Sequence, residues 1–381
     1  MLHRLRHTIG RHLVNIPGWR TDRKIIVFES DDWGSIRMPS KEVYQKLITE
    51  GIRVDKSFYD TYDTLEQRED LEFLFNSLVN YRDIRGNHPI FTFNTVMGNP
   101  AFDRIKEDNF ENYYHQFFFT SYKEYNQDNI ADLWHKAIKE NLIQPQFHAK
   151  EHLNVSLWME ALRKKHAETS IAFNHRFYGL KTNTPSFNQN NYLAAYWAEN
   201  ELEFDQKNNI LREGVEIFRR TFDYKPESFV ACNFIYPLEM EKTLSDLGIK
   251  YIQTQRGHIS PDIFTGNKKI KRHFTGQVNK INQIYTVRNC FFEPTLHQNK
   301  DSVNHCLKEI KTAFRWKKPA VISSHRINYV GGLSTQNRDY NLNKLGELLN
   351  LILKKWPEVE FFSSAKLGSV IKEVYENSYP S

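Results

Sequence analysis

Eight short runs of apolar and β-branched residues recur along the chain, separated by longer segments with helical periodicity. This alternation is typical of βαβ units, in which helices connect parallel strands. Because no GxGxxG pattern follows the first run, an open dinucleotide-binding sheet is not favoured. Eight strands suit a closed or nearly closed barrel, so we predict a deformed (β/α)7-8 barrel with helical insertions. The predicted strands are residues 24–30, 89–96, 144–148, 228–234, 250–255, 283–290, 320–325 and 360–364.

Four segments between these strands have the periodicity of amphipathic helices. Asn154 is a suitable N-cap for the second, because its side chain can accept a hydrogen bond from a free backbone N–H of the first turn. The predicted helices are residues 65–81, 155–166, 191–222 and 341–356.

Residues 22–381 contain no internal repeat, Gly/Ser linker or low-complexity run, so one elaborated domain is favoured over two. Residues near 99–144 are long for a single connection and rich in Tyr and Phe. We interpret them as an aromatic-rich insertion that walls one side of a cleft. The charge-rich stretch from Asp60 to Asp70 is interpreted as a solvated helix start.

The charge balance and the cysteines exclude some classes of protein. Lys and Arg exceed Asp and Glu by 52 − 46 = +6, which does not indicate a nucleic-acid partner. The three cysteines, Cys232, Cys290 and Cys306, are odd in number and lack CxxC spacing. They therefore indicate neither a disulfide framework nor a cysteine zinc site, and a reducing, cytoplasmic compartment fits best.

Residues 1–21 form a basic segment whose apolar residues recur every three or four positions, at Leu2, Leu5, Ile9 and Leu13. No apolar stretch is long enough for a secretory signal or a membrane span. Two interpretations stay open. The segment is an amphipathic helix packed on the barrel, or it makes weak peripheral contact with an anionic membrane surface.

Five polar residues are predicted to meet at one rim of the barrel. Asp31 and Asp32 end the first strand, His148 ends the third, and His325 ends the apolar run AVISSH. His152 lies four residues after His148, in the turn before the second predicted helix. Because catalytic residues of β/α barrels stand at the C-terminal ends of strands, these residues form a candidate site. Two imidazoles and a carboxylate can hold one divalent ion and leave a position open.

In these motifs the sequence resembles the polysaccharide deacetylases (carbohydrate esterase family 4, NodB homology) of the glycoside hydrolase/deacetylase superfamily. That family has an Asp-Asp motif on its first strand, an HxxxH motif on its third and a late strand ending in His. The resemblance implies that Asp31 is the general base and His325 the general acid. It also implies that Asp32, His148 and His152 are the metal ligands.

Two positions depart from the family pattern. After the fourth strand the family has an Arg that orients the catalytic base, whereas this chain has Cys232 and Asn233. The family motif that pairs an Asp with the acid His is not recognisable, and the segment VRNCFFEP offers Arg288 and Glu293 instead. The candidate substrate-binding residues are Trp33, Asn94, Asn233, Arg288 and Glu293.

The resemblance implies a hydrolase that removes acetyl groups from an N- or O-acetylated sugar with the help of a divalent metal. Zinc is the first choice, and cobalt, nickel or manganese also fit the ligand types. Three alternatives stay open. HAKEH also fits the H-x-x-E-H zinc-peptidase motif, with Glu151 as base and both histidines on one helix. Asp31 with Glu293 could serve a glycosidase, and a non-catalytic relative would only bind glycans.

Overall fold

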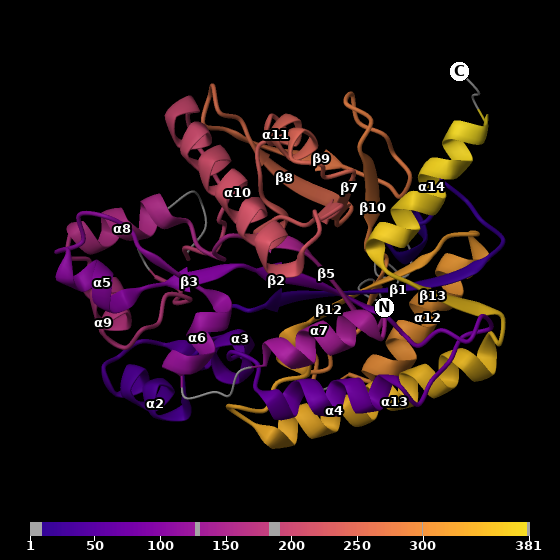
Figure 1. Ribbon diagram of the computed structural model, residues 1–381, viewed down its shortest axis with the longest axis horizontal. Coiled ribbons are helices and arrows are strands. Elements are labelled where there is room, and N and C mark those ends of the chain that lie inside the picture. Colours follow the sequence, from indigo (N-terminus) through magenta and orange to yellow (C-terminus); the bar gives the residue numbers. More distant parts are fainter. Residues whose placement is uncertain (1–9, 126–129, 183–190, 299, 379–381) are drawn as a thin grey trace.

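The structure, a computed structural model, describes residues 10–125, 130–182, 191–298 and 300–378 (Figure 1). Its centre is a sheet of nine strands in the order β10-β7-β6-β5-β2-β1-β12-β11, with β13 also paired to β1. Every pairing in this sheet is parallel. The strands are β1 (Lys24–Trp33), β2 (Phe91–Val96), β5 (Ile143–Ala149), β6 (Ser228–Phe229), β7 (Tyr251–Thr254), β10 (Ile284–Val287), β11 (Cys290–Phe291), β12 (Ala320–His325) and β13 (Val359–Phe362).

The two edge strands, β10 and β11, are consecutive in the chain and are separated only by Arg288 and Asn289. Because a two-residue connection cannot span a flat sheet, the sheet must curl until its edges approach each other. The predicted deformed β/α barrel is therefore confirmed. Each of the eight predicted strands overlaps a strand of this sheet.

Helices cover the outside of the barrel, with α4, α7, α12 and α13 along one side and α10 and α11 on another (Figure 1). Two antiparallel hairpins, β3 (Gly98–Pro100) with β4 (His115–Phe117) and β8 (Gly257–Pro261) with β9 (Lys268–Arg272), lie outside the main sheet. The helices of the described part are α2 (Lys41–Thr49), α3 (Phe58–Tyr62), α4 (Arg68–Leu78), α5 (Phe102–Glu107), α6 (Phe118–Glu124), α7 (Ala131–Lys139), α8 (Val155–Arg163), α9 (Ala167–Asn174), α10 (Glu201–Phe222), α11 (Met240–Asp246), α12 (Ser302–Arg315), α13 (Thr335–Lys355) and α14 (Ser364–Ser378).

The predicted helices correspond to α4, α8, α10 and α13, with one boundary clearly wrong. The prediction for Asn154 is confirmed, since its side chain accepts a hydrogen bond from the backbone N–H of Leu157. The helix predicted over 191–222 begins only at Glu201. Asn200 is its N-cap, with an extended backbone and a side chain that accepts from Glu203 N at 2.9 Å, and residues 192–198 are a non-helical segment that is mostly buried.

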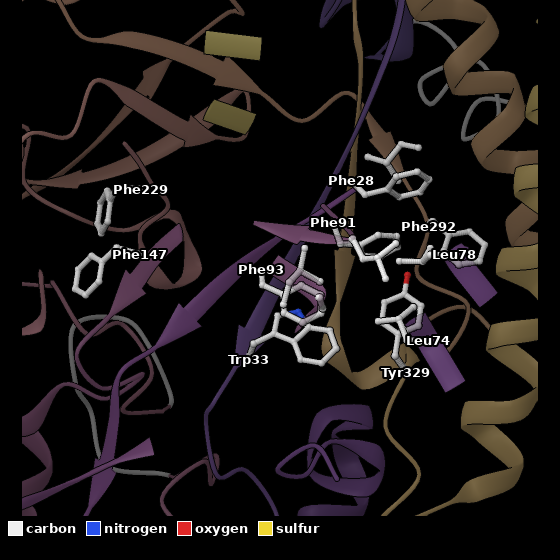
Figure 2. Packing of buried hydrophobic residues seen from close by; sticks show 14 of the residues in the cluster. Phe28, Trp33, Leu74, Leu78, Phe91, Phe93, Phe147, Phe229, Phe292 and Tyr329 are labelled. Carbon is white, nitrogen blue, oxygen red and sulfur yellow. The ribbon is translucent and has the colours of Figure 1, made fainter. Parts of the chain in front are cut away.

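The main core fills the space between the sheet and the helices packed on its outside, and Figure 2 shows part of it. Phe28 and Phe91, from neighbouring strands, stack with ring centroids 4.8 Å apart. Trp33 is fully buried and stacks on Phe93 at 3.7 Å. Such rings remove a large apolar area from water, so they anchor the strand ends that carry the polar residues described below.

The segment from 99 to 144 forms β3, α5, β4, α6 and α7, and its Phe118, Tyr122 and Trp134 belong to the main core. In the N-terminal segment, Leu2, Leu5 and Ile9 lie outside the described residues. Trp19 is buried, whereas Leu13 is 45% exposed. Across the described ranges, no helix combines the length and the apolar character that crossing a membrane requires.

Candidate functional site

The carboxyl ends of β1, β5 and β12 bring the five predicted residues together. Asp31 is directly paired with His325 in the parallel register of β1 and β12, and His148 stands near the end of β5. Since parallel strands end at the same rim, their terminal side chains face one space. That space is a cavity of about 280 Å³, and all five of Asp31, Asp32, His148, His152 and His325 line it.

Asp32 lies against both imidazoles. Its Oδ1 is 3.3 Å from His152 Nε2 and 3.6 Å from His148 Nε2. Its backbone is left-handed, with φ = 76°, which is costly for a residue with a side chain. The turn that carries this strain also points the carboxylate at the two rings, and strained residues of this kind concentrate at functional sites.

His148 is oriented as a metal ligand would be. His148 Nδ1 is 2.7 Å from the carbonyl oxygen of Val230, so in the neutral ring Nδ1 carries the proton and Nε2 is left for a metal ion. Burial lowers the pKa of His148, but Cys232 and the nearby carboxylates raise it well above its ordinary value. This corner therefore favours positive charge, and its nitrogen and oxygen donors fit a divalent ion.

Asp31 is held by a guanidinium from the junction of β10 and β11. Arg288 binds both carboxylate oxygens of Asp31, at 2.6 and 2.7 Å, and donates through Nε to Glu29 at 2.7 Å. Asn94, from β2, donates to Asp31 at 2.7 Å. Burial raises the pKa of Asp31, but the charge and hydrogen bonds of Arg288 outweigh it and leave this pKa below its usual range. Asp31 is therefore an oriented, ionised carboxylate.

His325 is held in the opposite charge state. Its Nδ1 donates to Glu293 Oε1 at 2.5 Å, and Asn328 donates to the other oxygen of Glu293 at 2.7 Å. Burial lowers the pKa of His325, but Glu293 and Asp31 raise it to about 9. Its Nε2 is 3.6 Å from Asp31 Oδ2. An imidazolium and a carboxylate thus face each other in the cavity.

The structure changes the interpretation of several predicted substrate contacts. Trp33 is a core residue and cannot stack on a sugar, because it is fully buried under Phe93. Asn94 and Arg288 are buried and bind Asp31 instead. Asn233 does line the cavity, whereas Glu293 contacts His325 from behind.

The sequence did not single out the cavity residues Arg37, Tyr59 and Lys181. Arg37 Nη2 is 3.3 Å from Asp32 Oδ2. The ring of Tyr59 meets His325 edge-on at 5.6 Å. These residues come from loops and a short helix rather than from strand ends, so no strand pattern marks them. In the described part of the chain, the cavity lining includes no residue from 99–144, so the described residues of the insertion do not wall this cleft.

The stretch from Asp60 to Asp70 is not solvated, contrary to the prediction. Asp63 and Glu66 are both fully buried and bind the guanidinium of Arg326, at 3.1 and 2.7 Å. Asp60 lines the cavity, and burial raises its pKa to about 7. The acidic pattern looked like a solvated face because its partner, Arg326, lies more than 250 residues away in the sequence.

No protein-family model matches the chain, and no curated protein matches it. Among solved structures, it is similar to a glycoside hydrolase/deacetylase from Parabacteroides distasonis, at 10% identity over 96% of this chain and 74% of that one, with a TM-score of 0.49. It is also similar to Puue allantoinase, at 10% identity over 95% and 94%, with a TM-score of 0.47. A 4-alpha-glucanotransferase from Thermococcus litoralis matches at 10% identity and a TM-score of 0.43 over 91% of this chain, which spans only 40% of that enzyme. Similarity this low leaves the activity to be argued from the site itself.

Proposed function

We propose that this chain is a metal-dependent hydrolase that removes acetyl groups from an N- or O-acetylated sugar. One observation carries the proposal: an ionised carboxylate, Asp31, and a protonated imidazole, His325, face each other beside a group of metal donors. Each has its own buried partner, Arg288 for the carboxylate and Glu293 for the imidazole. Acid–base hydrolysis of an amide or ester needs a pair of groups of this kind.

Asp32, His148 and His152 would hold the divalent ion, with zinc the first choice for two imidazoles and a carboxylate. When bound, such an ion polarises the acetyl carbonyl and makes water more acidic. Zn–N and Zn–O distances are about 2.0–2.2 Å, so tetrahedral ligand atoms stand roughly 3.3–3.5 Å apart. The separations of 3.3 and 3.6 Å from Asp32 to the two rings fit that spacing.

Asp31 would take a proton from the attacking water. Arg288 binds both of its oxygens and Asn94 one, so its carboxylate plane is fixed and cannot rotate away from the cavity. This fixed orientation replaces the one that the family obtains from an Arg after the fourth strand. A positioned base of this kind contributes on the order of 10²–10⁴-fold to the rate.

His325 would give a proton to the departing nitrogen or oxygen of the sugar. Glu293 fixes its Nδ1 proton, so the proton on Nε2 is the one that faces the cavity. In one turnover, Asp31 gains a proton and His325 loses one. Water has then been added across the acyl bond, and exchange with solvent restores both groups.

The cavity suits a small polar substrate. Its volume of about 280 Å³ lies just below the ~300–1,000 Å³ that is typical of ligand sites, which favours one sugar unit over a long enclosed chain. Tyr59 and Phe234 offer ring surface for stacking, while Asp60, Lys181 and Asn233 offer partners for hydroxyl groups.

The alternatives are less well supported. His148 lies in strand β5 and His152 in the loop after it, so the pair does not share a helix as the inverted zinc-peptidase motif requires. Glu151 is buried and faces Lys150 at 3.5 Å. For a glycosidase, Glu293 would have to reach the substrate, but it binds His325 and Asn328 and is not among the described residues that line the cavity.

The test measures acetate release from a panel of N- and O-acetylated mono- and oligosaccharides, with zinc content and folding checked for each variant. Asp31→Asn and His325→Ala should keep metal and fold, yet lose on the order of 10²–10⁴ of the rate. Glu151→Gln is the matched control, because it changes a buried carboxylate next to His152 without touching the proposed chemistry. Loss of activity in Glu151→Gln with Asp31→Asn unaffected would favour the peptidase. Shortened sugars without acetate would favour the glycosidase.

A further inference from the structure

Cys232 stands at the position where the resembling family has its base-orienting Arg. It follows β6, is fully buried, and begins the short turn Cys232–Phe234. Its Sγ is 3.8 Å from His148 Nε2, and the donor atoms of His148, His152 and Cys232 all lie within 4.8 Å of one another. Since Arg288 already binds Asp31, this position is not needed for orienting the base.

The sulfur faces the ligand side of the imidazole. In the neutral ring the proton of His148 is on Nδ1, where it is donated to Val230 O, so the Nε2 that faces Cys232 is the atom available to a metal ion. Most buried free cysteines act as small apolar residues. Cys232 differs from that case because its sulfur approaches the same Nε2 that lies 3.6 Å from Asp32 Oδ1.

The separation fits a shared ion. With Zn–S about 2.3 Å and Zn–N about 2.0–2.1 Å, a sulfur and a nitrogen at neighbouring corners of a zinc tetrahedron stand roughly 3.5 Å apart. The 3.8 Å between Cys232 Sγ and His148 Nε2 is within a few tenths of an ångström of that value.

The backbone after Cys232 is strained. Asn233 and Phe234 both adopt left-handed conformations, with φ of 56° and 55°. For residues with side chains, each such conformation costs on the order of 1–3 kcal/mol, and it persists where the surroundings enforce it. The turn places Asn233 in the cavity and the ring of Phe234 over Arg288, with 5.2 Å between the guanidinium and the ring centroid. It also fixes where the Cys232 sulfur lies.

We propose that Cys232 is a ligand of the metal ion together with His148 and His152, whose donor atoms lie within 4.8 Å of its sulfur, beside the proposed ligand Asp32. The inference rests on the proposed function for the presence of an ion, but not on the substrate. Binding releases the thiol proton, and the thiolate and carboxylate together balance the two positive charges. A thiolate favours zinc or cobalt over manganese.

The experiment uses the full chain loaded with cobalt and, separately, with zinc. Wild type with cobalt should show the intense near-ultraviolet absorption of sulfur-to-cobalt charge transfer, and zinc X-ray absorption should show one sulfur at about 2.3 Å. Cys232→Ser should lose both signals and bind zinc about 10-fold or more weakly, given that even partners outside the ligand shell are worth 10–100-fold. Cys290→Ala is the matched control, since Cys290 is an equally buried free thiol, and should keep both signals.

The outcomes separate this inference from the proposed function. Wild type that retains one ion without a sulfur signal overturns the Cys232 assignment and leaves the deacetylase proposal intact. A signal that survives in Cys232→Ser but disappears in Cys290→Ala overturns it as well. Failure of wild type to retain any ion overturns both. The X-ray measurement on wild type does not depend on how well any variant folds.

Discussion

Replacing Arg288 with Met should damage both the fold and the proposed chemistry. Arg288 is buried, and its three hydrogen bonds of 2.6–2.7 Å go to two carboxylates that are themselves buried, Asp31 and Glu29. Removing one partner of a buried ion pair costs about 3–5 kcal/mol, because the remaining charge is left uncompensated. That is a large part of the ~5–15 kcal/mol by which a typical domain is stable.

The size of this loss should depend on pH. In wild type the pKa of Asp31 is held below its unfolded value, so the stabilisation is fully present above about pH 4 and is lost as the pH falls toward the folded pKa. Without Arg288 the pKa of Asp31 rises. The difference in unfolding free energy between wild type and Arg288→Met should therefore be large at pH 7 and narrow below about pH 4.

Urea unfolding at pH 7 and at pH 3 measures the difference in unfolding free energy between wild type and Arg288→Met. The control variant is Arg219→Met. Arg219 also makes two hydrogen bonds of 2.8 Å to one carboxylate, Glu216, but both side chains are more than 40% exposed. An exposed pair of this kind is screened by solvent and contributes little to stability. If Arg288→Met lost no more stability than Arg219→Met, or lost the same amount at pH 3 as at pH 7, the reasoning about Arg288 would be refuted.

Two further predictions concern the metal and the N-terminal segment. Elemental analysis of the purified protein should find about one divalent ion per chain, and His148→Ala or His152→Ala should remove it. A wild-type protein that contains no metal and gains no thermal stability when zinc is added would contradict this prediction. If the basic N-terminal segment binds anionic lipid, the full chain should co-sediment with acidic vesicles at low salt and be released at high salt. Identical sedimentation of a chain that starts at Thr21 would instead support packing on the barrel.

The strand framework was predictable because each strand is a continuous local pattern. AVISSH, for example, contains enough β-branched and apolar residues to identify β12 and its end at His325. The start of α10 was not predictable in the same way. The apolar residues between 192 and 198 resemble a helical face, but they are buried as an irregular segment, and the helix begins only where Asn200 caps it. Tertiary packing outweighed local propensity there.

The convergence of the five site residues was also predictable, because most of them stand at strand ends. The residues that bind them were not predictable in this way. Arg288 was considered a substrate contact, because its sequence position shows only that it lies near the rim. Its side chain turns inward to Asp31 because it stands in the two-residue junction of β10 and β11, where the edges of the curled sheet approach each other. Contacts such as Arg37 with Asp32, or Arg326 with Glu66, depend on how the loops fold over the rim. No periodic pattern in the sequence predicts these contacts.

The partners of Asp31 and His325 give the two groups opposite charge states at neutral pH. Burial alone would make Asp31 neutral and His325 neutral, since it opposes the charged form of each. Arg288 reverses this for the carboxylate, and Glu293 reverses it for the imidazole, whose pKa rises to about 9. Titratable neighbours whose pKa values are pushed apart mark the acid and the base of a site. Two buried ion pairs whose charges must be taken out of water are therefore best explained by the proton transfers that Asp31 and His325 are proposed to carry out.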